Sequence, residues 1–241
     1  MKLLKNSINI CLLLITSVLA SGPIGTALVR LLAPQPDWQG AGVFINNFSH
    51  VQLLPYFFGY GLIIGSILLV SAIYQLAKDE DKGPMLPSLI FVSIYAALVS
   101  LNYLVQTTFI PALVARSADG ASILISALSM ANPNSLAWAI QMYGYMFLGL
   151  SFLWLYPYFK KGRFSKQIFV LLVVNAAMGV FGAFTSSYQL DWVISLPGMI
   201  SFIAWNIVFA ALIIFIMFDL QDKNVRVRPE KIVARRKKAK I

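Results

Sequence analysis

The chain has 241 residues, of which 59% are hydrophobic and only 12% are charged, and its net charge is +10. Soluble domains carry about a quarter charged residues, so this composition excludes an ordinary soluble protein and favours one that lies in a bilayer. The only cysteine is Cys11, which excludes an intrachain disulfide and a metal site built from cysteines.

Six apolar stretches are long enough to cross a membrane, for which a helix needs about 20 mostly apolar residues. None of the six contains an acidic residue, and Arg30 is their only basic residue, as the cost of an isolated charge in hydrocarbon requires. We therefore predict an all-α, polytopic transmembrane bundle. The expected membrane domain covers residues 1–218, with spans at about 8–32, 51–76, 85–111, 136–159, 167–187 and 192–218.

The first stretch has two interpretations. Lys2 and Lys5 precede an apolar run that ends in Val18-Leu19-Ala20 before small residues, as in a cleavable signal peptide. Cleavage of residues 1–20 would leave five spans. Because the apolar run continues through Ile24–Leu32, we favour an uncleaved helix with a kink or unwound turn near Pro23.

The distribution of basic residues predicts the orientation. With six spans, both termini and the loops 77–84 and 160–166 lie on one side, which carries 17 of the 19 Lys and Arg residues. The other side carries Arg30 and Arg116. Cytoplasmic segments are enriched in basic residues, so we expect both termini in the cytoplasm, and the membrane to be a prokaryotic plasma membrane.

Residues 219–241 form a basic tail that we expect to be disordered or to form a short helix on the inner leaflet. Its last basic residues predict contact with anionic lipid headgroups, at about 1 kcal/mol for each residue. A protein partner of the tail and a homo-oligomer stay open as alternatives, and we expect no nucleic acid. The residues assigned to this surface are Arg235, Arg236, Lys237, Lys238 and Lys240.

The outer connections are long. Residues 33–50 are rich in Pro, Gly and Asn, which predicts a loop. Residues 121–131 are apolar but too short to span, and Ser122, Ser126 and Ser129 share a helical face. We predict a short helix there, at the outer surface.

Uncharged polar side chains recur in four of the spans. Amides in hydrocarbon need partners, so these side chains should point into the bundle, where they either join helices or line a polar cavity. The candidate ligand-binding residues are Asn102, Gln106, Gln141, Tyr145, Asn175 and Asn206. The pattern Gly61-x-x-x-Gly65 predicts close helix packing inside the bundle, with a homodimer face as the alternative.

The sequence points away from catalysis. His50 is the only histidine, which excludes two-histidine haem ligation and zinc hydrolases of the two-histidine type. We expect no cofactor, no metal site and no catalytic residue, and His50 with Asp37 is the only candidate acid–base pair. The favoured function is binding or transport of an uncharged or lipidic small molecule. The alternative is an accessory or structural subunit that docks a partner through its tail or outer loops.

Overall fold

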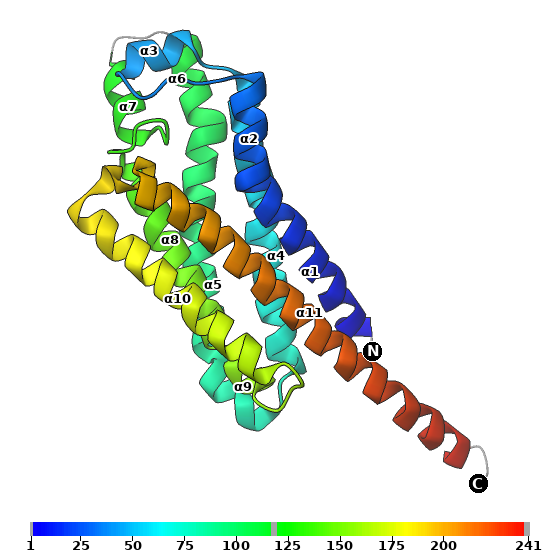
Figure 1. The fold of residues 1–241 in the computed structure, drawn as a ribbon. Helices are drawn as coiled ribbons and strands as arrows, with labels where there is room; N and C mark the ends of the chain where they lie inside the picture. Colours follow the sequence, from blue (N-terminus) through cyan, green and yellow to red (C-terminus); the bar gives the residue numbers. More distant parts are fainter. Residues whose placement is uncertain (1, 117–119, 239–241) are drawn as a thin grey trace.

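The computed structural model describes residues 2–116 and 120–238, and the side chains of residues 3–116 and 120–225. In these parts of the chain all regular structure is helical (Figure 1). Six helical stretches are long and apolar enough to cross a membrane, which confirms the predicted polytopic bundle. They are Leu3–Leu32, His50–Leu76, Asp79–Arg116, Leu136–Phe159, Ser165–Tyr188 and Leu196–Val225.

Individual helices divide these spans further. The third span contains a π-helical turn, Val105–Phe109, and 3₁₀ turns lie at His50–Leu53 and Leu190–Ile194. The last of these turns moves the start of the sixth span from the predicted residue 192 to Leu196. The α-helices are α1 (Lys2–Ser21), α2 (Pro23–Leu32), α3 (Ala41–Asn46), α4 (Leu54–Leu76), α5 (Asp79–Leu104), α6 (Ile110–Arg116), α7 (Ala121–Leu128), α8 (Leu136–Leu153), α9 (Tyr156–Phe159), α10 (Ser165–Tyr188) and α11 (Leu196–Lys238).

The first span is broken where the sequence predicts a break. Helix α1 ends at Ser21 and α2 begins at Pro23, with Gly22 between them outside helical geometry. Proline fits the first turn of a helix, where its missing N–H costs no hydrogen bond. The predicted kink near Pro23 is therefore confirmed, and two helices share this span.

The six spans form a closed ring in chain order. Helix α4 packs on α1 and α5, α8 packs on α5 and α10, and α11 packs on α10 and α1. Aromatic and aliphatic side chains fill the centre, where Leu14, Tyr95, Phe152 and Phe209 are fully buried. Large apolar side chains also cover the outside of the ring, and in a bilayer they contact lipid. The chain is thus a multi-pass membrane protein; its exposed apolar residues include Ile64, Ile90, Val170, Phe181, Phe184, Ile203 and Ile207.

The glycine pattern of the second span serves packing inside the ring. A side chain at Gly61 would meet Ser17 of α1, and a side chain at Gly65 would meet Leu14 of the same helix. The absence of a Cβ at both positions lets α4 approach α1 closely. The predicted use of Gly61-x-x-x-Gly65 within the bundle is therefore confirmed.

The ring has two different ends. Helices α3, α6 and α7 lie together at one end, and the N-terminus, α9 and the α4–α5 connection lie at the other (Figure 1). We call the first the outer end and the second the inner end. Residues 33–53 and 120–135, here called the outer cap, share a small apolar cluster with the end of the third span. Its buried members are Ala41, Phe44, Ile110, Ala121 and Ile125. Helix α7 confirms the predicted short helix in residues 121–131.

Helix α11 extends beyond the ring at the inner end (Figure 1). The sequence predicts a disordered tail or a short helix on the inner leaflet from residue 219, and in the structure one helix continues to Lys238. Asp219, which the sequence assigns to the tail, is buried, with 1% of its surface exposed. Asp219 therefore packs at the inner end of the sixth span, where its charge is paired with Lys223.

Candidate functional site

Three of the predicted polar residues form a hydrogen-bonded network between α5 and α8. The Asn102 Nδ2 donates to Gln141 Oε1 at 2.9 Å and to the Ala137 carbonyl at 3.2 Å. The Gln141 Nε2 donates to the Tyr103 hydroxyl at 3.0 Å, and that hydroxyl lies 3.3 Å from the hydroxyl of Tyr145. The network therefore joins Asn102, Gln141 and Tyr145 through Tyr103, and it ties the two helices together.

Gln106 connects this network to the outer cap. Its Nε2 donates to Asn102 Oδ1 at 3.3 Å and to the Leu128 carbonyl at 2.8 Å, and its Oε1 accepts from the Met130 N–H at 3.0 Å. Gln106 thus satisfies two main-chain groups where the chain leaves α7. Because buried main-chain groups need partners, these bonds fix the segment after α7 on the end of the ring.

The π-helical turn that carries Gln106 has a local cause. Pro111 has no N–H, so a regular helix cannot continue its hydrogen bonds through this position. The Ile110 N–H instead bonds to the Val105 carbonyl, five residues earlier. The hydroxyls of Thr107 and Thr108 donate to the carbonyls of Tyr103 and Leu104 at 2.7 and 2.6 Å, which satisfies groups that the wider turn releases. Such π turns are frequent at functional sites.

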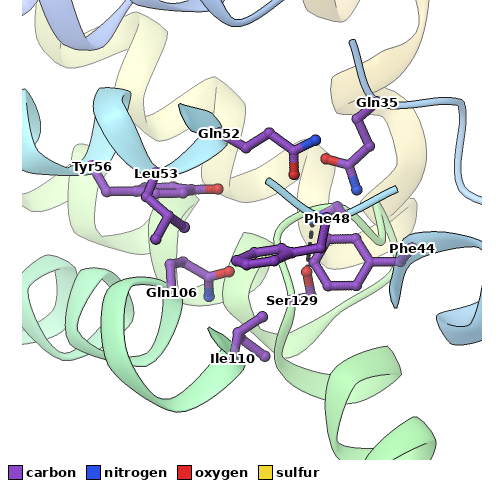
Figure 2. Close-up of a pocket in the computed structure, with 10 residues that line it drawn as sticks. Gln35, Phe44, Phe48, Gln52, Leu53, Tyr56, Gln106, Ile110 and Ser129 are labelled. Carbon is purple, nitrogen blue, oxygen red and sulfur yellow. Dashed lines mark hydrogen bonds between the residues drawn. The ribbon is translucent and has the colours of Figure 1, made fainter. Parts of the chain in front are cut away.

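A small cavity lies beside Gln106 at the outer end, under the outer cap. Its volume is about 40 Å³, which is room for about three water molecules. Figure 2 shows Gln35 and Gln52 on one side of the cavity and Gln106 on the other. Aromatic rings from the outer cap and from α4 complete the wall. The lining residues are Gln35, Phe44, Phe48, Gln52, Leu53, Tyr56, Gln106, Ile110, Ser129 and Ala131.

The polar groups around the cavity fall into two classes. Gln52 is already bonded, since its Nε2 donates to the carbonyls of Ala33 and Asn47 at 3.3 and 3.0 Å. Gln106 is also fully bonded within the protein. The amide of Gln35 and the hydroxyl of Tyr56 form no hydrogen bond with any described residue. These two groups are therefore free to bind a molecule in the cavity.

Of the six predicted residues only Gln106 lines this cavity, and two of the other five also lie outside the network. Asn175 of α10 is fully buried, and neither its Oδ1 nor its Nδ2 has a hydrogen-bond partner among the described residues. Asn206 of α11 donates to the Phe202 carbonyl of its own helix at 2.7 Å and packs against Gly22, at the break in the first span. The structure therefore does not bring Asn175 or Asn206 into the α5–α8 network.

Tyr145 links the network to the centre of the ring. Its ring centroid lies 4.7 Å from that of Trp205 and 5.9 Å from that of Tyr95. Trp205 stacks in turn on Phe209 at 5.3 Å. These four side chains belong to the main hydrophobic core of the bundle or pack against it.

The other candidate residues are placed as follows. His50 is exposed and its ring packs on Phe48 at 5.4 Å, and no ion pair joins it to Asp37, although both are described. Among the described residues, no three His, Cys, Asp or Glu side chains are grouped so that they could hold a metal ion. Of the predicted membrane-surface residues, Arg235, Arg236, Lys237 and Lys238 have a described backbone only, within α11. Lys240 lies outside the described residues.

Sequence reasoning missed several residues of the site. Gln35, Gln52, Tyr56 and Tyr103 were not among the candidates. One signal was present for Gln52, because Ser49-x-x-Gln52 matches the sequence pattern of a capping box. The structure forms this capping box. The Ser49 Oγ accepts a hydrogen bond from a main-chain N–H, and the Gln52 Oε1 accepts one from the Ser49 N–H. The others have no local signal, since their position depends on which spans are neighbours.

Comparisons with known proteins do not assign this chain to a family. The chain matches no protein-family model, no curated protein and no solved structure. The function therefore has to be inferred from the site itself.

Proposed function

We propose that this chain is a non-catalytic membrane protein that binds a small, uncharged molecule in the cavity at its outer end. The observation that carries this proposal is the pair of unbonded polar groups, the Gln35 amide and the Tyr56 hydroxyl, which line one cavity with aromatic side chains. Ligand sites commonly combine apolar walls with a few polar groups that orient the ligand.

The lining of the cavity defines the class of ligand. None of the ten lining residues is charged, so an ion would lose its water without gaining a counter-charge. Phe44 and Phe48 favour an apolar or aromatic part, and the free amide and hydroxyl favour a carbonyl or hydroxyl group on the ligand. An uncharged molecule with one polar end fits this combination.

The present volume of about 40 Å³ admits only water, so a larger ligand requires the outer cap to move. The outer cap is suited to such a movement because its buried apolar residues cluster with the end of the third span around Ile110 and not with the main core. Its short helices can shift while the ring stays packed. Tyr145, Trp205 and Phe209 pack on one another in the main core, so aromatic rings occupy the interior of the bundle, which supports binding rather than transport.

A mass-spectrometric experiment tests this proposal. The protein is purified in mild detergent and denatured, and the released small molecules are compared between variants. Gln35→Leu with Tyr56→Phe should abolish recovery of a molecule that the native chain retains. The matched control is Gln39→Leu with Tyr60→Phe, since Gln39 belongs to the outer cap, Tyr60 packs on Tyr103, and neither residue lines the cavity. Equal recovery from both variants, or no retained molecule in the native chain, would refute the proposal.

A second candidate function, an accessory subunit, is supported by α11. This helix continues past the ring to Lys238, and nine Lys and Arg residues lie between residues 223 and 240. A basic helix of this kind suits an acidic protein partner or the anionic surface of the cytoplasmic leaflet. The same charge distribution supports our proposal that both termini are cytoplasmic. Deletion of residues 226–241 should release a copurifying partner if this role is correct.

A further inference from the structure

A groove on the lipid-facing surface lies at the inner end, between the start of α10 and α11. Its volume is about 390 Å³, and it is lined by Lys166, Gln167, Val170, Leu171 and Phe215. Helices α10 and α11 lie side by side in Figure 1 and pack on each other. The groove therefore has a polar rim at the level where α10 begins and an apolar floor within the span.

The rim of the groove carries unpaired positive charge. Lys166 lines it, and Lys161 and Arg163 lie in the loop before α10. All three are exposed, and none forms an ion pair with a described acidic side chain. The nearby Asp219 is already paired with Lys223 at 2.9 Å and is almost fully buried.

Arg163 is held close to the groove through aromatic contacts. Its guanidinium carbon lies 5.3 Å from the centroid of the Phe164 ring, and that ring packs on Phe215 of the groove with centroids 5.6 Å apart. The cation–π contact keeps the guanidinium beside the apolar floor while its N–H groups stay free to donate. Lys166 and Arg163 can therefore bind one anionic group from two directions.

The floor of the groove is suited to a hydrocarbon chain. Val170 has 56% of its surface exposed, and Phe215 is half-buried. Beyond the groove, Val173 and Val174 continue an exposed apolar surface along α10 towards the centre of the span. An acyl chain that runs along this surface would cover it from the rim inwards.

We propose that this groove is a binding site for an anionic glycerophospholipid. The phosphate binds Lys166 and Arg163, and an acyl chain lies along Val170, Leu171 and Phe215. The unpaired cations select an anionic headgroup over a zwitterionic one, and the apolar floor selects a lipid over a free phosphate. This site lies at the opposite end of the ring from the outer cavity and does not depend on the function proposed there.

Native mass spectrometry of the full chain in detergent tests this site. The protein is titrated with phosphatidylglycerol and, separately, with phosphatidylcholine of the same acyl chains. Tighter binding of phosphatidylglycerol is expected, with a loss of about fivefold in its affinity for each cation removed in Lys166→Gln and in Arg163→Gln. Lys5→Gln is the matched control, since it removes one exposed charge from the inner end without touching the groove.

Two further variants and a competition experiment distinguish a bound lipid from other molecules in the groove. Val170→Asp should weaken phosphatidylglycerol binding because it places an acid on the floor, and Lys166→Arg should preserve it. Soluble glycerol phosphate should not displace the lipid. Equal affinity for the two lipids, an effect of Lys5→Gln as large as that of Lys166→Gln, or displacement by glycerol phosphate would each overturn the proposal. All of these residues are exposed, so the variants should fold.

Discussion

The inner and outer ends of the ring are held by different interactions. At the inner end, Lys160 binds Asp81 of α5 at 2.6 Å, and this ion pair fixes the loop between α9 and α10 to the third span. Lys223 pairs with Asp219 of its own helix at 2.9 Å and donates to the Tyr158 carbonyl of α9 at 3.2 Å. At the outer end, no ion pair lies among the described residues of the outer cap, and the Gln106 amide binds main-chain groups instead.

This difference has a physical consequence for the two ends. Ion pairs at the inner end anchor the side that also carries most of the basic residues, next to the lipid headgroups. An amide that bonds to main chain fixes the outer cap with neutral hydrogen bonds, each worth about 0.6 kcal/mol on average in a membrane protein. The free energy needed to open the outer cap should therefore be lower than the free energy needed to open the inner end.

The largest effect is expected from Gln106→Leu. This change leaves the Met130 N–H and the Leu128 carbonyl without partners, at about 1–3 kcal/mol for each buried group. The loss should be local, so residues 121–135 should become sensitive to protease while the six spans stay folded. Gln39→Leu is the control, because Gln39 is exposed in the outer cap. Unchanged proteolysis of Gln106→Leu would show that other contacts hold the outer cap.

Asp219→Asn should have a smaller effect, at the inner end. Lys223 loses its charged partner but keeps the Tyr158 carbonyl at 3.2 Å and the face of the Tyr158 ring at 3.7 Å. Since the lysine side chain is still 29% exposed, we expect a loss of about 1–2 kcal/mol rather than the larger cost of an isolated buried charge. This loss of stability is measured by thermal unfolding monitored through tryptophan fluorescence. An unchanged thermal midpoint would contradict the assigned ion pair.

Lys160→Met should lower the thermal midpoint less than Asp219→Asn does, because the Lys160 side chain is 42% exposed and water weakens its ion pair with Asp81, although the Asp81 side chain is only 12% exposed. The hydrogen bond from Lys160 to Asp81 raises the pKa of Lys160 above its usual value of 10.5. A raised lysine pKa stabilises the fold below about pH 10.5, and this contribution is lost as the pH rises through the pKa of the folded state. The difference between the native chain and Lys160→Met should therefore persist at neutral pH and disappear at alkaline pH.

Asn175→Leu provides the smallest expected effect, in the middle of the ring. Its amide has no described partner, so replacing it with an apolar side chain that has the same number and branching of heavy atoms should leave the thermal midpoint unchanged or raise it. Asn102→Leu is the matched comparison, since it breaks bonds to Gln141 and to the Ala137 carbonyl and should lower the midpoint. A large loss of stability for Asn175→Leu would indicate that its amide binds water or another group.

The sequence predicts the course of the chain better than it predicts the site. Hydropathy, charge and Pro23 identify six spans and a broken first helix, because each depends on residues close together in sequence. The partners of a polar side chain depend on which helices are neighbours. Helical spacing predicts inward faces for both Asn102 and Asn175. In the structure Asn102 bonds to Gln141, whereas the Asn175 amide has no hydrogen-bond partner among the described residues.

The missed features have a similar explanation. The π-helical turn shifts Gln106 relative to a regular helix, and it depends on how Pro111 and two threonines share hydrogen bonds. Gln35 lies in a loop that folds back on the ring, which no periodic pattern describes. Asp219 appeared to belong to the tail because hydropathy cannot register its ion pair with Lys223.

Hydrogen–deuterium exchange of the protein in lipid nanodiscs tests the central claim, that the outer end opens and the inner end is fixed. Peptides from residues 41–53 and 121–135 should exchange about tenfold faster than peptides from residues 155–165, although all of them lie at the ends of spans. Gln106→Leu should accelerate only the outer peptides. Equal protection at the two ends, or faster exchange at the inner end, would contradict the assignment of the outer cap as the movable cover of a binding site.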